Sequence, residues 1–171
     1  MLPLLVWALG WFATGHASAL SAKGEKAPDF KVKTLDGKHL TLKSLISPGK
    51  NQKKVVVLAF WATWCPPCCK EAPHLNAIHK KYSGKSVAVI GIAIDQEGAK
   101  PVREAVKKMG LKYTIGLDPD GARAADKYGV DYIPSLFVVD SHGIIRYTRQ
   151  GYQANLEHDL GAVIDSLLKR K

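Results

Sequence analysis

The segment VVVLAFWATWCPPCCKE, residues 55–71, decides the fold of this chain. It begins with an apolar run rich in β-branched residues, which is typical of a buried strand. The run stops at Trp64, and Cys65 and Cys68 follow at the start of a helical pattern. The sequence therefore predicts two thiols, three residues apart, at a junction between a strand and a helix.

Further strands and helices are expected on both sides of this segment. Strands are predicted over 30–33, 39–42, 53–61, 86–95, 113–117, 135–139 and 144–148, and helices over 44–46, 66–82, 100–109, 122–128 and 155–168. Strands that alternate with helices predict a mostly parallel sheet with helices on both faces. Hairpins near the two ends add antiparallel strands. The expected class is α/β, a central mixed sheet flanked by helices, with an added N-terminal hairpin and no second domain within 23–171.

The formal net charge of +10 lies mostly outside the centre of the chain. Residues 23–54 hold nine Lys against three acidic residues, and the last three residues are all basic. No basic stripe with interleaved aromatic residues appears, which argues against binding to nucleic acid. A basic surface near an anionic membrane or an acidic partner is the simpler interpretation.

The N-terminal 22 residues contain no charged side chain, and residues 2–13 are almost continuously apolar. The small residues 17–19 fit a cleavage site, so we expect residues 1–22 to be an export signal peptide. No basic residue precedes the apolar run, and the 22 residues of the whole segment approach the roughly 20 that span a bilayer. A retained N-terminal membrane anchor, which would tether the domain, and a buried helix of the domain are the alternatives. Export would place the thiols in the periplasm or at the outer face of the cytoplasmic membrane, where disulfides persist.

The three cysteines are clustered, which favours a reactive site over a disulfide scaffold. A thiolate is the nucleophile in disulfide exchange, and a helix N-terminus favours an anion. Cys65 stands at that end and is the expected attacking thiol, while Cys68 lies one turn further on and can close a disulfide with it. Pro66 and Pro67 suit the first helical turn, but they also remove two N–H donors near the Cys65 sulfur. We therefore expect a smaller depression of the Cys65 pKa and a more reducing couple.

The motif FWATWCPPCCKEAP (60–73) resembles the exported TlpA/ResA-like thiol–disulfide oxidoreductases of the thioredoxin superfamily. The resemblance extends to APDF (27–30), to KYGVDYIPSLFVVDSHG (127–143) and to the terminal helix, so it covers nearly all of residues 26–169. It implies a thioredoxin-like fold whose only redox group is the Cys65–Cys68 disulfide, with no other cofactor and no metal.

The same resemblance implies a substrate-binding region around the disulfide. Ile133 and Pro134 match the family's cis-proline motif, in which the backbone of the residue before proline pairs with an incoming substrate strand. An ordinary trans-proline at a strand edge is the alternative. Trp64 is expected to flank the active site as a contact surface, and Pro66 and Pro67 complete the expected substrate-binding set.

Glu71 is the expected partner of Cys68 in proton transfer. Thioredoxins place a buried Asp six residues before the first cysteine, and this chain has Ala59 there. The resembled subfamily instead has a Glu three residues after the second cysteine, which Glu71 matches. The alternative is an ordinary glutamate on the helix surface. Trp61, by contrast with Trp64, is expected to pack in the core.

Cys69 departs from the family pattern, where a basic residue is usual. It is either a thiol shielded by Cys68 or a competitor for Cys65, from which it is four residues away. The Cys65/Cys69 spacing also fits a Sco-like copper-binding chaperone, with His142 as the nearest candidate ligand. A non-catalytic thioredoxin-like interaction module is a further alternative. A peroxiredoxin would carry Pro-x-x-x-Thr-x-x-Cys, which is completed at neither Cys65 nor Cys68.

The sequence thus predicts an exported thiol–disulfide oxidoreductase that reduces its substrates. Cys65 would attack a substrate disulfide and Cys68 would resolve the mixed disulfide. In an oxidising compartment the protein would need electrons, and the resemblance implies a membrane thiol-electron carrier as their source. The resemblance also implies exported protein disulfides as substrates, including apocytochrome c cysteines during cytochrome c maturation. We expect a monomer.

Overall fold

The structure is a computed structural model that describes residues 20–49 and 52–169. Most of the predicted signal peptide or anchor, residues 1–19, lies outside the described residues. Within the part that is described, no helix is both long enough and apolar enough to cross a membrane.

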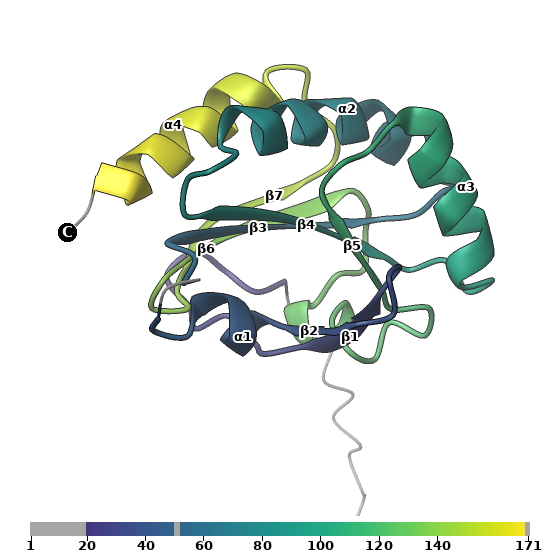
Figure 1. The fold of residues 1–171 in the computed structure, drawn as a ribbon, viewed down its shortest axis with the longest axis horizontal. Coiled ribbons are helices and arrows are strands. Elements are labelled where there is room, and N and C mark those ends of the chain that lie inside the picture. The colour runs from purple at the N-terminus through teal and green to yellow at the C-terminus, as the bar shows by residue number, and fades with distance from the viewer. Residues whose placement is uncertain (1–19, 50–51, 170–171) are drawn as a thin grey trace, which may run out of the picture.

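Seven strands form one mixed sheet in the order β2-β1-β5-β4-β3-β6-β7 (Figure 1). The strands are β1 (Lys31–Thr34), β2 (His39–Thr41), β3 (Val55–Trp61), β4 (Val87–Ala93), β5 (Thr114–Leu117), β6 (Ser135–Asp140) and β7 (Ile145–Gln150). The helices are α1 (Leu42–Ile46), α2 (Pro66–Lys81), α3 (Ala99–Met109) and α4 (Leu156–Lys169), with the 3₁₀ helix η1 (Asp126–Tyr128). The predicted class, a mixed sheet flanked by helices with an N-terminal hairpin, is confirmed.

The prediction of a mostly parallel sheet is wrong, because only two pairs of neighbouring strands in the described residues, β3–β4 and β4–β5, are parallel, and the other four pairs are antiparallel. The end of β5 and the start of β6 lie at the same edge of the sheet, since Leu117 pairs with Ala93 and Ser135 pairs with Phe60. The chain therefore leaves β5 and enters β6 at the same end of the strands. Consequently β6 runs antiparallel to β3, and β7 folds back on β6.

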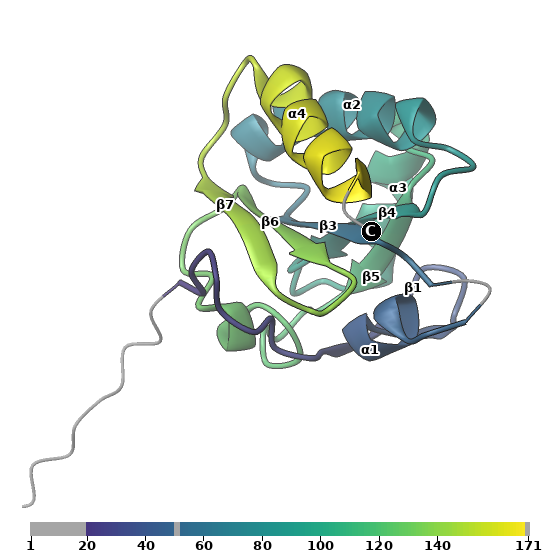
Figure 2. The same ribbon diagram turned by 90° about the vertical axis from the view of Figure 1, so that its left-hand side faces the viewer.

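Both faces of β3 are buried, which explains its uninterrupted apolar sequence. Alternate residues of β3 contribute to two different cores, one on each face of the sheet. Helices α2, α3 and α4 lie over one face, and α1 lies over the other (Figure 1). In Figure 2, the hairpin β6–β7 forms the sheet edge beyond β3, with α2 and α4 above the sheet. The redox segment thus joins a fully buried strand to a helix that packs on one face of the same sheet.

The predicted helix over 122–128 is mostly a turn, and only η1 at its end is helical. The carboxylate of Asp118 accepts hydrogen bonds from the backbone N–H groups of Arg123, Ala124 and Ala125 at the start of this segment. Gly129, with a φ of 65°, ends it, so only one 3₁₀ turn lies between them. Asp118 itself is fully buried.

Candidate active site

The strand-to-helix junction is held in place by Asp95, which lies just after β4. The backbone N–H of Thr63 donates to the two carboxylate oxygens of Asp95 at 3.0 and 3.3 Å, and the Thr63 hydroxyl donates to the same carboxylate. Asp95 is buried. Because β3 and β4 are parallel neighbours, their carboxyl ends meet at one edge of the sheet. Asp95 can therefore fix the segment that leads from β3 into α2.

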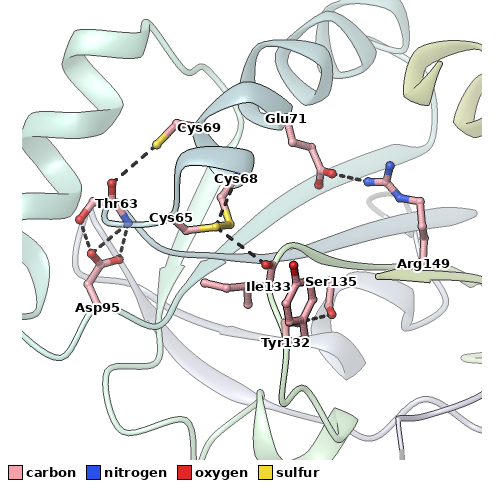
Figure 3. Close-up of a disulfide and its surroundings, with 10 residues drawn as sticks. All are labelled: Thr63, Cys65, Cys68, Cys69, Glu71, Asp95, Tyr132, Ile133, Ser135 and Arg149. Carbon is pink, nitrogen blue, oxygen red and sulfur yellow. Dashed lines mark hydrogen bonds and ion pairs between the residues drawn. A yellow bond between two sulfur atoms is a disulfide. The ribbon is translucent and has the colours of Figure 1, made fainter. Parts of the chain in front are cut away.

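Cys65 is the N-cap residue of α2 and forms a disulfide with Cys68 (Figure 3). Its Sγ accepts a hydrogen bond from the backbone N–H of Cys68 at 3.3 Å. Pro66 and Pro67 are the first two residues of α2, so neither carries an N–H that could reach this sulfur. The predicted position of Cys65 at the positive end of a helix is confirmed, as is the pairing with Cys68.

The carbonyl oxygen of Ile133 lies next to the disulfide, 3.9 Å from the Cys65 Sγ. The Ile133–Pro134 peptide bond is cis, as predicted. The loop that carries it is closed by a hydrogen bond of 2.6 Å from the Ser135 hydroxyl to the carbonyl of Tyr132. Figure 3 shows Ile133 and Tyr132 on the side of the disulfide away from α2. The structure therefore brings Ile133, from a loop 68 residues further along the chain, to the Cys65 sulfur.

Two exposed aromatic side chains belong to the segments that meet at the disulfide. Trp64, directly before Cys65, is 66% exposed, and Tyr132, directly before Ile133, is 59% exposed. Among the described residues they are the two most exposed of the large hydrophobic side chains. Trp61 is buried in the core, as predicted. The sequence analysis identified Trp64 but missed Tyr132, whose exposure depends on the tertiary placement of its loop.

Glu71 is buried and forms an ion pair with Arg149 of β7 (Figure 3). The alternative of an ordinary surface glutamate is therefore wrong. Burial raises the pKa of Glu71 above its ordinary value, while the charge and hydrogen bond of Arg149 pull that pKa back down. Cys68 lies one turn earlier on the same buried side of α2. Among the described residues, Glu71 has no hydrogen bond to Cys68, whose sulfur is bonded to Cys65 in this state.

Arg149 and Asp95 are two buried charged residues near the disulfide that were not predicted from the sequence. Arg149 pairs with Leu136 across the sheet and so faces the core beneath α2. Arg149 lies one residue beyond the predicted strand 144–148, whereas β7 extends to Gln150, so the predicted pattern gave no sign that this charge faces inward. Asp95 is the last residue of the predicted strand 86–95. The carboxyl ends of neighbouring parallel strands meet at one edge of a sheet, so this position was a signal that could have placed Asp95 near the disulfide.

Cys69 points to the other side of α2 from Glu71 (Figure 3). Its Sγ lies 3.6 Å from the carbonyl oxygen of Thr63, with which it makes a weak hydrogen bond. Cys69 is a free thiol, because Cys65 is bonded to Cys68. In this disulfide state Cys69 does not compete for Cys65.

The geometry does not support the copper alternative. Over residues 20–49 and 52–169, no group of three or more His, Cys, Asp or Glu side chains is placed to hold a metal ion. His142 lies in the turn after β6, whereas the disulfide lies at the start of β6. The strand between them has six residues, or about 20 Å at 3.3 Å per residue.

Comparisons with known proteins agree with this geometry. Residues 23–148 match the sequence profile of the AhpC/TSA family. Thiol-disulfide oxidoreductase ResA from Bacillus anthracis is 38% identical over 120 residues, which cover 70% of this chain and 65% of that protein. The match thus spans just under two thirds of the length of that relative.

Two further proteins match over most of their length. Thioredoxin-like protein YneN from Bacillus subtilis is 32% identical over 161 residues, covering 92% of this chain and 90% of that protein. A crystal structure from Chlorobium tepidum, provisionally assigned as thiol:disulfide interchange protein DsbE, superimposes with a TM-score of 0.77 at 28% identity. That superposition covers 88% of this chain and 99% of the other. This chain belongs to the AhpC/TSA family and, within it, to the thioredoxin-like proteins related to ResA.

Proposed function

We propose that this protein is a thiol–disulfide oxidoreductase that reduces disulfides of exported proteins through Cys65 and Cys68. The observation that carries the proposal is the position of Cys65. It caps the N-terminus of α2, accepts the N–H of Cys68, and lies beside the carbonyl of Ile133. A thiolate formed there is stabilised by the helix end. Its resolving partner is already within bonding distance, since the two cysteines form a disulfide.

The reduced protein reacts in two exchange steps. The Cys65 thiolate attacks one sulfur of the substrate disulfide, forming a mixed disulfide and releasing the other substrate sulfur as a thiolate. Cys68 then loses its proton, attacks the Cys65 sulfur, and releases the second substrate thiolate. The substrate gains two electrons, and the protein is left with the Cys65–Cys68 disulfide. We propose Glu71 as the group that accepts the Cys68 proton.

The substrate would dock against the rim of the disulfide. Trp64 offers exposed aromatic surface next to Cys65. The carbonyl of Ile133, before Pro134, is a backbone acceptor beside the attacking sulfur, suited to an extended substrate segment. Pro66 and Pro67 line the helix start and complete the contact surface.

We further propose that the protein works outside the cytoplasm, in the periplasm or at the outer face of the cytoplasmic membrane. The uncharged N-terminal sequence supports export, either as a cleaved signal peptide or as a membrane tether. A reductant in that compartment requires a membrane thiol-electron carrier to restore its dithiol. Apocytochrome c is a candidate substrate, and the protein would act as a monomer.

A trapping experiment tests the function. Cys68→Ser should accumulate a mixed disulfide between Cys65 and its substrate, which non-reducing gel electrophoresis and mass spectrometry would identify. Cys65→Ser is the matched control and should trap nothing. Adducts that consist only of a small thiol would overturn the proposal of a protein substrate. Insulin reduction that survives Cys65→Ser would overturn the assignment of the active centre. A glutathione titration giving the potential of a strong oxidase would overturn the direction.

A further inference from the structure

The ion pair between Glu71 and Arg149 stands out among the charged contacts of the described residues. Both side chains are almost fully buried, with 2% and 5% exposure. Every other ion pair in this part of the chain has at least one side chain that is 30% exposed or more. The two residues are 78 apart in sequence and come from α2 and β7.

Stability alone does not explain this pair. The Nε and Nη1 atoms of Arg149 are buried and have no hydrogen-bond partner among the described residues. Each such unmet donor costs about 1–3 kcal/mol, and a buried ion pair is often no more stabilising than apolar residues of the same volume. A cation with unmet donors in the core therefore points to a role in the chemistry of its partner.

The groups packed around Glu71 show which of them can act on its charge. Tyr113, just before β5, and Tyr147 of β7 face the same interior. Burial raises the pKa of each tyrosine, and the nearby charge of Glu71 adds a smaller contribution in the same direction. His74 of α2 attracts Glu71 more weakly than Arg149 does, and it is already paired with Glu157 of α4 at 2.8 Å.

Two more groups on this side of the sheet complete the inventory. Cys69 of α2 is a titratable neighbour of Tyr113, and Trp61 of β3 has a buried Nε1 without a partner. The thiol and the tyrosines are not cationic. Arg149 is thus the permanent positive charge in contact with Glu71.

We propose that Arg149 is a positioning residue that keeps Glu71 ionised beneath the redox pair, so that Glu71 can accept the proton of Cys68 during resolution. The inference rests on the proposed function and extends it to a residue outside the redox motif. Cys68 and Glu71 are one helical turn apart on the buried side of α2, which separates their Cβ atoms by about 5–6 Å. A proton can cross such a gap directly after side-chain rotation, or through one water molecule.

The proton transfer requires Glu71 to be ionised. The Cys68 proton passes to the Glu71 carboxylate, and the Cys68 sulfur forms a bond to Cys65. The bond between Cys65 and the substrate sulfur breaks, and its electron pair leaves with the substrate. A glutamate buried without Arg149 would hold its own proton at neutral pH, and it could not accept a second one.

A two-phase assay with the reduced protein separates this step from the first. The probe is a symmetric aromatic disulfide whose thiolate product is coloured. Attack by Cys65 releases the first thiolate, and resolution by Cys68 releases the second. The rate of the second phase is measured against pH for the wild type, Arg149→Met, Arg149→Lys and the double variant Glu71→Gln/Arg149→Met.

Arg149→Met is expected to slow the second release about tenfold or more at neutral pH, and to displace its pH profile to higher pH. The first release serves as the internal reference and should keep its rate. Arg149→Lys should restore much of the second phase, because it returns the positive charge. The double variant, which leaves no unpaired buried charge, should be as slow as Arg149→Met and should lose the pH dependence that Glu71 causes.

The matched control is Arg146→Met. Arg146 lies on the same strand and pairs with Asp140 at 2.6 Å, near the turn between β6 and β7. This control should keep the wild-type profile. A wild-type profile in Arg149→Met would overturn the inference, as would an Arg149→Lys variant as slow as Arg149→Met. If the wild type itself releases no thiolate, the proposed function fails instead.

Discussion

Replacing Pro67 should make the Cys65 thiolate more stable. Cys65 is the N-cap of α2, and an N-cap side chain accepts hydrogen bonds from the second or third helical residue. The third residue, Cys68, already donates to the Cys65 sulfur at 3.3 Å. The second is Pro67, which has no N–H. Pro67→Ala therefore supplies the donor that the sequence omits.

The size of this effect follows from a single hydrogen bond to a charged group. Such a bond contributes about 1.5 kcal/mol or more, which corresponds to a fall of about one unit in the Cys65 pKa. Because the thiolate belongs to the reduced form, its stabilisation should make the couple more oxidising by about 30 mV. The loss of proline rigidity in the unfolded chain should lower the free energy of unfolding by less than about 1 kcal/mol.

The assay is a titration of thiolate absorbance against pH, combined with a glutathione redox titration. Both use a Cys69→Ser background, so that only Cys65 and Cys68 titrate. Pro66→Ala is the matched control, since the first helical residue does not donate to the cap and the pKa should change less. Equal shifts in Pro66→Ala and Pro67→Ala would refute the hydrogen-bond argument, and so would a Pro67→Ala potential that became more negative.

Three further predictions concern docking, packing and pH. Trp64→Ala removes a side chain that is 66% exposed. It should raise the KM for a protein disulfide about fivefold, which corresponds to a loss of about 1 kcal/mol of binding free energy. An altered midpoint of thermal unfolding would instead indicate a structural role. In Gly116→Ala the new Cβ would lie 2.6 Å from Cγ2 of the buried Val32, so the free energy of unfolding should fall by about 1–3 kcal/mol, and an unchanged urea midpoint would contradict this packing. Since burial raises the pKa of Glu71 above its ordinary value of 4.5, the stability of the wild type relative to Glu71→Gln should be greatest below that pH and should fall as the pH rises through the folded-state pKa. Urea unfolding at a series of pH values measures this difference, and a rise with pH would mean that Arg149 outweighs burial.

Local sequence patterns were sufficient for most secondary structure and for the redox pair. The apolar run of β3, the cysteines at the start of α2 and the proline pair in its first turn all depend on residues close together in the chain. The same holds for the N-terminal hairpin, whose register pairs Lys31 with Thr41. The predicted helix over 122–128 was wrong although its surroundings are local, because Asp118, which accepts the N–H groups of Arg123, Ala124 and Ala125, is only five to seven residues away. The direction of β6 was beyond local patterns, since it depends on where the chain re-enters the sheet.

The sequence by itself determined which cysteines form the disulfide, because Cys65 and Cys68 are three residues apart and their spacing on a helix is a local property. Only the tertiary structure decided what surrounds them. It brings the carbonyl of Ile133 to within 3.9 Å of the Cys65 sulfur and places Arg149 against Glu71. The physical reason is that periodicity reports which face of an element is buried, whereas the partner found on that face depends on how distant elements pack.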